Sequence, residues 1–463
     1  MKQNSAVNYG LGLGKKEKQM IFKEKTIGVI SLGCDKNRVD TEKMLGILGA
    51  EHITNDIAEA QIIIVNSCAF LESARKEALD AVFECNEYRD NGKLEKLILT
   101  GCLPQKFIAD LYEELVEVDA FLGTNDYELI PEVIERCYKG ERVNAVGKKD
   151  WVNSTDRVVT TPLHYAYLKI ADGCNNFCTY CLIPKIRGKY RSEKMEVLIE
   201  ETEKLGDVAE LILVAQDVTR YGVDIYGKPA LVELIQKLSA LDNVEKIRLL
   251  YCYPDMLSDE LIAEIKSNDK VIKYVDIPLQ HADDGVLKRM NRKGTGKEYL
   301  ALIEKLRAEI PQIAIRSTFI AGFPGETDEQ FGNLLAFIKK AKLNNAGFFA
   351  YSREEGTPAY KLDGQIEEEV KEQRVKKLYT AQKAISRKIL KSYVGKIVEV
   401  VADGINYDKE TFEGRCYFSA PEIDGKVYFT SNEQVCQGEK YSVLVHSADA
   451  YDLYGEVVDE FTE

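Results

Sequence analysis

The chain has 463 residues, which is long for a single hydrophobic core and predicts several domains. Its formal net charge of −14 disfavours a nonspecific nucleic-acid surface. No apolar run is long enough for a membrane span, and residues 1–25 lack the apolar stretch of a secretory signal. Eleven cysteines without such a signal indicate thiolate ligands in a reducing compartment rather than disulfides, so we expect a cytoplasmic protein.

The N-terminal part of the chain is expected to form a parallel α/β sheet. Residues 1–24 show no periodicity, and we expect them to be disordered. From residue 26 onward, short apolar runs at 27–32, 62–65 and 97–100 alternate with helical patterns. This alternation is typical of a parallel sheet covered by helices.

Each of these three runs is followed by a cysteine: Cys34, Cys68 and Cys102. Because ligands of open α/β sheets gather at the carboxyl ends of the strands, we expect the three thiols to converge on one edge. The alternative is three small buried residues that happen to follow strands. Two other cysteines, Cys85 and Cys137, fall inside helical patterns, as expected of cysteines that bind no ligand. The contrast with the three strand-end cysteines favours a shared ligand for those three.

A linker is expected at 143–162, followed by a second α/β unit. Its strand-like runs lie at 166–171, 210–216, 246–252, 274–280, 313–320 and 346–351. Six strand–helix steps predict an open, partial barrel, whose chemistry lies at the carboxyl ends of the strands. After a charged helix at 368–391, short runs separated by turn signals predict a small terminal β-barrel.

The loop after the first strand of the second unit carries Cys174, Cys178 and Cys181 with C-x3-C-x2-C spacing. Three thiolates can ligate three irons of a four-iron cluster and leave the fourth iron open to a substrate. An ordinary four-iron site uses four thiolates, and a structural zinc site needs four N or S ligands. The spacing resembles the radical S-adenosylmethionine (SAM) loop, in which SAM binds the open iron. A zinc knot or three core cysteines are the alternatives.

Three further phrases resemble the methylthiotransferase family: residues 31–42 (SLGCDKNRVDTE), 276–281 (DIPLQH) and 316–326 (RSTFIAGFPGE). Together with the order of the units, they extend the resemblance over residues 26–459. Within the family, the phrases look like the branch that modifies the small-subunit ribosomal protein S-twelve. The transfer-RNA branch has a tyrosine-glycine-cysteine-glutamine context at the first cysteine, which Cys34 lacks.

The resemblance implies an α/β multidomain fold. A flavodoxin-like α/β domain with an auxiliary iron–sulfur cluster is expected at 25–142. A partial (β/α)6 radical SAM barrel is expected at 163–392, and a small TRAM-like β-barrel at 393–463.

The resemblance also implies two 4Fe-4S clusters, one on Cys34, Cys68 and Cys102 and one on Cys174, Cys178 and Cys181. SAM cleaved at the second cluster would give a 5′-deoxyadenosyl radical, which takes a hydrogen from the β-carbon of an aspartate in the ribosomal protein. Sulfur then fills the vacancy, and a second SAM supplies the methyl group, which gives 3-methylthioaspartate. One cluster does one-electron chemistry and the other stores sulfur.

The resemblance further places SAM near Gln216, Asp217, Gln280 and Gly322. It places Arg187 and Arg191 beside the cluster loop. Two alternatives remain open here: Gly322 lies in a segment that could be an ordinary strand-to-helix turn, and the two arginines could be surface charges.

The expected partners are ribosomal protein S-twelve, free or in the ribosome, and an electron donor such as flavodoxin or ferredoxin. Residues 393–463 carry five Lys or Arg against fifteen Asp or Glu, a net charge of −10. A transfer-RNA methylthiotransferase is therefore disfavoured, because a barrel that binds RNA should be basic. A noncatalytic iron–sulfur electron carrier is also disfavoured, because an electron carrier gains from full thiolate ligation.

Overall fold

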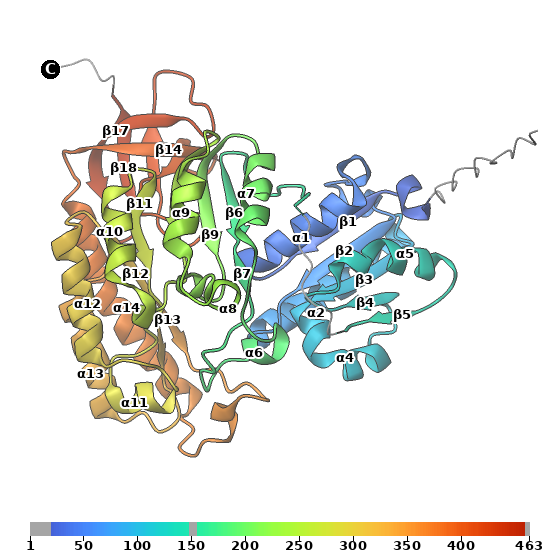
Figure 1. The fold of residues 1–463 in the computed structure, drawn as a ribbon, viewed down its shortest axis with the longest axis horizontal. Helices are drawn as coiled ribbons and strands as arrows, with labels where there is room; N and C mark the ends of the chain where they lie inside the picture. Colours follow the sequence, from blue (N-terminus) through green and yellow to red (C-terminus); the bar gives the residue numbers. More distant parts are fainter. Residues whose placement is uncertain (1–19, 148–154, 459–463) are drawn as a thin grey trace, which may run out of the picture.

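The computed structural model describes residues 20–147 and 155–458. Figure 1 shows three units in chain order: an open sheet in blue, a larger curved sheet in green and yellow, and a small barrel in red. Within the described residues, no helix is long and apolar enough to cross a membrane.

The first sheet is parallel, and its strands follow chain order: β1 (Ile27–Ser31), β2 (Ile62–Ser67), β3 (Lys96–Gly101), β4 (Ala120–Leu122) and β5 (Val143–Ala145). Successive side chains of a strand point to opposite faces. Thus Ile63 and Val65 join the apolar cluster beneath two of the helices, whereas Ile62 and Ile64 join the cluster on the other face. The layered α/β architecture is confirmed, although flavodoxin itself places its second strand at an edge.

Both faces of this sheet are covered by helices (Figure 1). One face packs against α2 (Glu72–Asn86) and α4 (Cys102–Glu114), and the other against α1 (Asp35–Leu48) and α5 (Ile130–Tyr138). The short helical segments of this unit are α3 (Tyr88–Asn91) and the 3-10 turns η1 (Ile21–Glu24), η2 (Ala50–His52), η3 (Ile57–Glu59) and η4 (Tyr127–Leu129).

Two boundary predictions need correction. Three strands were expected and five are present, because β4 and β5 have only three residues each and carry too little pattern to be recognised. β5 also lies inside the predicted linker 143–162, where Val143 pairs with Ala120. Of the segment expected to be disordered, residues 1–19 lie outside the described part of the chain, but Ile21–Glu24 forms a 3-10 turn because Phe22 packs into the core.

The second sheet is also parallel and open, in the order β13-β12-β11-β10-β9-β6, which confirms the partial barrel. Its strands are β6 (Tyr165–Lys169), β9 (Val208–Val214), β10 (Val244–Leu249), β11 (Val271–Asp276), β12 (Ala314–Ala321) and β13 (Asn345–Ala350). Its long helices are α7 (Met195–Lys204), α9 (Leu231–Ser239), α10 (Asp259–Ser267), α12 (Gly296–Glu309), α13 (Asp328–Ala341) and α14 (Glu368–Lys391).

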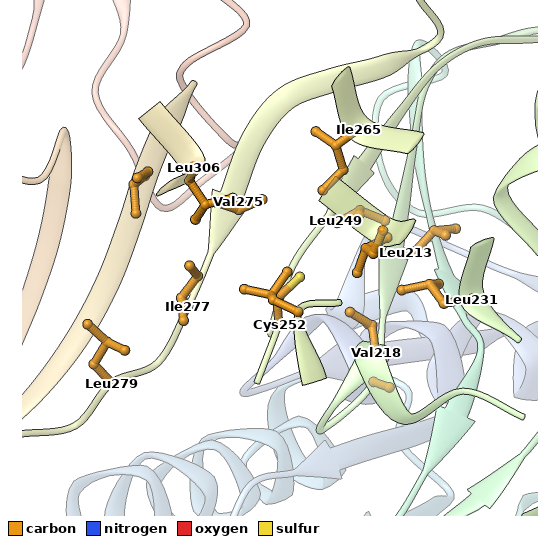
Figure 2. Close-up of a cluster of buried hydrophobic side chains, with 14 of the residues drawn as sticks. Leu213, Val218, Leu231, Leu249, Cys252, Ile265, Val275, Ile277, Leu279 and Leu306 are labelled. Carbon is orange, nitrogen blue, oxygen red and sulfur yellow. The ribbon is translucent and has the colours of Figure 1, made fainter. Parts of the chain in front are cut away.

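Apolar side chains lock these helices onto one face of the sheet. Figure 2 shows Leu213, Leu249 and Val275 of the strands together with Leu231 and Ile265 of the helices. The shorter elements lie in the loops: β7 (Ala171–Asp172), β8 (Arg191–Ser192), α6 (Ile183–Ile186), α8 (Val223–Tyr226), α11 (Asp284–Arg289), η5 (Val218–Arg220), η6 (Pro254–Met256) and η7 (Pro358–Lys361).

The third unit is a closed barrel, as expected of a TRAM-like domain. Its strands are β14 (Ile397–Asn406), β15 (Thr411–Arg415), β16 (Val427–Thr430), β17 (Lys440–Ala448) and β18 (Leu453–Val457). The barrel packs against the other face of the second sheet, where Tyr167 and Ile212 share an apolar cluster with Val400 and Phe418. The second and third units therefore share one apolar interface.

A buried ionic cluster fixes the first unit against the second. The carboxylate of Glu201 on α7 lies 3.0 Å from Lys43 of α1 and 2.7 Å from Arg157. Arg157 also lies 3.3 Å from Glu42 of α1. Lys43 and Arg157 are buried. If Glu201 loses its charge, their positive charges are left partly unpaired in the interior.

We therefore expect Glu201→Gln to lower the free energy of unfolding by about 3–5 kcal/mol, as measured from the denaturant transition. The neighbouring Glu200→Gln is the matched control, because the Glu200 side chain is 56% exposed and, among the described residues, contacts Lys204 and Thr155 near the surface. It should change stability by no more than about 1 kcal/mol. Equal effects of the two substitutions would contradict a role of this cluster in domain docking.

Candidate functional site

All six cysteines that the sequence patterns single out line one cavity of about 650 Å³. The cavity lies where the carboxyl ends of the strands of both sheets face each other. The structure thus brings the two cysteine groups, more than seventy residues apart in the chain, into one site.

Strand register and the backbone conformation of Gly33 determine how close the first three cysteines lie. Ser67 pairs with Gly101 across β2 and β3, so Cys68 and Cys102 leave the sheet side by side. Gly33 (φ +92°) lets the loop with Cys34 approach them, because a Cβ at Gly33 would lie 2.7 Å from the Cβ of Cys68. The thiols predicted to converge therefore do lie at one sheet edge.

Asn37 of α1 contacts the segments that carry this trio. Its amide donates to the carbonyls of Leu32 (3.1 Å) and Ser67 (3.0 Å), and its Oδ1 lies 3.8 Å from the Sγ of Cys102. The side chain thereby ties the ends of β1 and β2 to the start of α4.

The second trio lies on the loop after β7. Backbone N–H groups donate to two of its sulfurs, from Asn176 to Cys174 (3.4 Å) and from Ile183 to Cys181 (3.4 Å). The loop turns sharply at Gly173 (φ +77°), where a Cβ would lie 2.2 Å from the carbonyl oxygen of Lys189. These contacts shape a loop whose three sulfurs face the cavity.

Burial sets the protonation of these thiols. It raises the pKa of Cys102 to about 12 and that of Cys174 to about 11, so both are neutral near pH 7 unless a cation binds. A metal centre would take them as thiolates and release their protons.

The donor set fits iron–sulfur clusters better than a single ion. Among the described residues, no three His, Cys, Asp or Glu side chains lie close enough together to hold one metal ion. The six thiols that line one large cavity provide two sets of three thiolate ligands for such clusters.

A buried ionic bridge joins the two trios. The guanidinium of Arg187 lies 3.0 Å from Asp40 of α1 and 2.9 Å from Asp172, two residues before Cys174, and it also donates to Asn37. Lys169 pairs with the same two aspartates. Arg187 is only 2% exposed, which overturns the interpretation of this residue as a surface charge.

Of the other predicted residues, Gln216 and Gln280 line the cavity, and Asp217, Gly322 and Arg191 do not belong to its walls. Gln216 donates to Asp172 at 3.1 Å, and its Oε1 is buried without a partner among the described residues. Gln280 has a positive φ of 72° and lies in the loop four residues after the end of β11.

The three remaining residues support neighbouring segments. The carboxylate of Asp217 accepts a hydrogen bond from Asn176 (3.2 Å), inside the second cysteine loop. The Gly322 N–H donates to Glu326 (2.6 Å), and Arg191 donates to the carbonyl of Arg187 (3.1 Å).

Sequence reasoning missed several residues around the sulfurs. The hydroxyl of Tyr253 lies 3.1 Å from the Sγ of Cys178, and the Arg292 guanidinium lies 4.1 Å from the Tyr253 ring centre and 3.9 Å from that sulfur. Tyr253 follows a predicted strand, which is a weak signal. Arg292 has no signal at all, because it reaches the site from a loop.

Lys36 and Tyr251 were also missed, and both line the cavity beside Cys34. Lys36 stands inside the phrase 31–42, where its position two residues after the cysteine was the available signal. Tyr251 follows β10 and adopts a positive φ of 62°, which no sequence pattern marks.

Comparison with known families accounts for each unit. Residues 26–123 match the uncharacterized protein family UPF0004, residues 168–338 match the radical SAM superfamily, and residues 394–458 match the TRAM domain. The fold is similar to that of the radical S-adenosylmethionine methyltransferase TsrM from Kitasatospora setae, with a TM-score of 0.53. The two chains are 12% identical, and the match covers 70% of this chain and 72% of that chain. At this identity the similarity supports the fold alone.

Full-length relatives are more similar. The ribosomal protein uS12 methylthiotransferase RimO of Clostridium botulinum (strain Eklund 17B / Type B) is 48% identical over 94% of this chain and 98% of its own. The protein of the same name from Lachnoclostridium phytofermentans is 47% identical over 92% of this chain and 98% of its own.

Proposed function

The chain belongs to the RimO family of ribosomal protein uS12 methylthiotransferases, and we propose that it inserts sulfur at the β-carbon of an aspartate of uS12 and methylates that sulfur. It is a radical SAM enzyme of the transferase class, and it uses iron–sulfur chemistry and SAM. The observation that carries the proposal is the convergence of six cysteines on one cavity.

Each trio of cysteines would hold one 4Fe-4S cluster: Cys174, Cys178 and Cys181 the first, and Cys34, Cys68 and Cys102 the second. Bound there, the two clusters would supply the electron that cleaves SAM and the sulfur that replaces a hydrogen of the substrate. The second SAM supplies the methyl group, and the product is 3-methylthioaspartate.

The residues of this chain then hold the reactants in place. Gln216 and Gln280 offer amide donors and acceptors to SAM from the cavity wall. Arg187 keeps the two cysteine-bearing edges in register through its aspartate partners. Asp217, Gly322 and Arg191 remain predicted SAM-site residues, and they would act through the loops that they support.

The partner of the enzyme is proposed from its charge. The terminal barrel segment carries a net charge of −10, which attracts a basic ribosomal protein and repels transfer RNA. An electron donor such as flavodoxin or ferredoxin would supply the reducing equivalent. We propose a cytoplasmic location, because the proposed substrate is a ribosomal protein, free or in the ribosome.

Intact-mass analysis of uS12 from cells with and without this gene tests the reaction. We expect the protein from cells with the gene to carry the mass of one methylthio group in place of a hydrogen. An unmodified uS12 together with a methylthiolated transfer RNA would instead assign the chain to the transfer-RNA branch.

Replacement of Cys174, Cys178 and Cys181 with Ala should abolish formation of 5′-deoxyadenosine from SAM. The iron content should fall from about eight to about four atoms per chain, because the other trio can still load. Continued formation of 5′-deoxyadenosine would refute the assignment of these thiols.

The reciprocal variant, with Cys34, Cys68 and Cys102 replaced by Ala, is the matched control. It should show the same loss of iron, but SAM cleavage should continue while uS12 receives no sulfur. If uS12 were still methylthiolated, these three thiols would be structural.

Reversal of three exposed barrel acids, Asp408, Glu410 and Glu433, to Lys should slow the association of the holoenzyme with uS12 at low salt. The difference from the parent should shrink as salt rises, because the Debye length falls from about 10 Å at 0.1 M to about 3 Å at 1 M. Stopped-flow association kinetics measure both effects.

A matched control reverses three exposed acids on the outer helices, Glu260, Glu304 and Glu329. It changes the net charge equally but leaves the barrel unaltered. The same slowing in both variants would show that only total charge, and not the barrel, guides uS12.

A further inference from the structure

Lys36 is one of two cations that line the six-cysteine cavity within the described residues; the other is Arg187. The guanidinium of Arg187 is already engaged by Asp40 and Asp172. Lys36 is therefore the cation of the cavity wall that is available to bind an anionic ligand.

The structure holds the ammonium of Lys36 in a fixed position. Its Nζ lies 2.9 Å from Oδ1 of Asp35 and 3.4 Å from the ring centre of Tyr251. The Tyr251 hydroxyl donates to Asp35 (3.4 Å), and its backbone N–H donates to Asp276 (3.2 Å). A lysine held by a neighbouring carboxylate and an aromatic face loses little further freedom when a ligand binds.

The polar groups around Lys36 are incompletely satisfied. An ammonium has three donors, and Asp35 is its single hydrogen-bond partner among the described residues. Oδ2 of Asp35 is also buried without a partner in that part of the chain, and as a carboxylate oxygen it can only accept a hydrogen bond. The two remaining donors of the Lys36 ammonium favour a ligand with an acceptor atom, because an unmade hydrogen bond costs free energy in the interior.

The position of Lys36 limits which group can occupy the remaining donors. Lys36 lies two residues after Cys34, and Tyr253, two residues after Tyr251, contacts Cys178 of the second trio. A ligand bound to Lys36 therefore lies between the two groups of thiols. A carboxylate suits this place, because it can accept a charge-assisted hydrogen bond from a remaining donor of the Lys36 ammonium.

We propose that Lys36 binds the side-chain carboxylate of the target aspartate of uS12, with Tyr251 and Asp35 as positioning residues. This inference rests on the proposed function. The β-carbon of an aspartate is bonded directly to its carboxyl carbon, so a fixed carboxylate also fixes the carbon that loses hydrogen. The same contact discriminates aspartate from asparagine, which carries no charge.

A double-mutant cycle tests the contact with the reconstituted holoenzyme and purified uS12. The enzyme is the parent, Lys36→Gln or Lys36→Arg, and uS12 carries either its target aspartate or asparagine at that position. The parent should bind the aspartate form about 10- to 100-fold more tightly than the asparagine form. Lys36→Gln should bind both forms with equal affinity, and Lys36→Arg should retain part of the preference.

Lys76→Gln is the matched control, because Lys76 is an exposed lysine on α2 of the same unit. It should keep the full preference for aspartate. Iron and sulfide content per chain show for every variant that the clusters are present, and Lys36→Arg provides a second variant if Lys36→Gln folds poorly.

The outcomes separate this inference from the proposed function. If Lys36→Gln weakens both forms of uS12 equally, or keeps the preference for aspartate, Lys36 does not bind the target carboxylate. A parent enzyme that methylthiolates uS12 but binds both forms equally overturns the inference alone. A parent enzyme that leaves uS12 unmodified overturns the function on which the inference rests.

Discussion

The buried ionic bridge between Arg187 and the two aspartates Asp40 and Asp172 holds the site together. It joins helix α1, which follows Cys34, to the short strand that precedes Cys174. An arginine suits this task because its planar guanidinium can bind several acceptors in fixed directions. The two cysteine loops belong to separate sheets, so their mutual position depends on contacts of this kind.

Burial of charge at this interface is expensive, and the chain compensates it by pairing. Lys169 supplements Arg187, and Glu201 with Lys43 and Arg157 forms a second buried cluster nearby. Such networks add little net stability compared with apolar packing, but they penalise any other arrangement of the two sheets. These contacts therefore fix the position of the first cysteine-bearing sheet relative to the second.

The walls of the cavity combine apolar and polar groups with different tasks. Phe70, Leu71 and Phe349 give the cavity an apolar wall. The hydroxyl of Tyr253 lies 3.1 Å and the guanidinium of Arg292 3.9 Å from the sulfur of Cys178. The terminal barrel packs against the other face of the second sheet, and no described residue of the barrel lines the cavity.

The sequence by itself determined the order of the three units, the α/β character of the first two, the closed barrel and the two cysteine trios. These features follow from local periodicity and from short spacings, which a chain carries regardless of its tertiary contacts. Strands β4 and β5 escaped notice because three residues hold too little pattern. The proximity of the two trios, the burial of Arg187, and the places of Lys36, Tyr251 and Arg292 were decided only by the tertiary structure. They depend on how two sheets dock, and docking is governed by contacts between residues far apart in the chain.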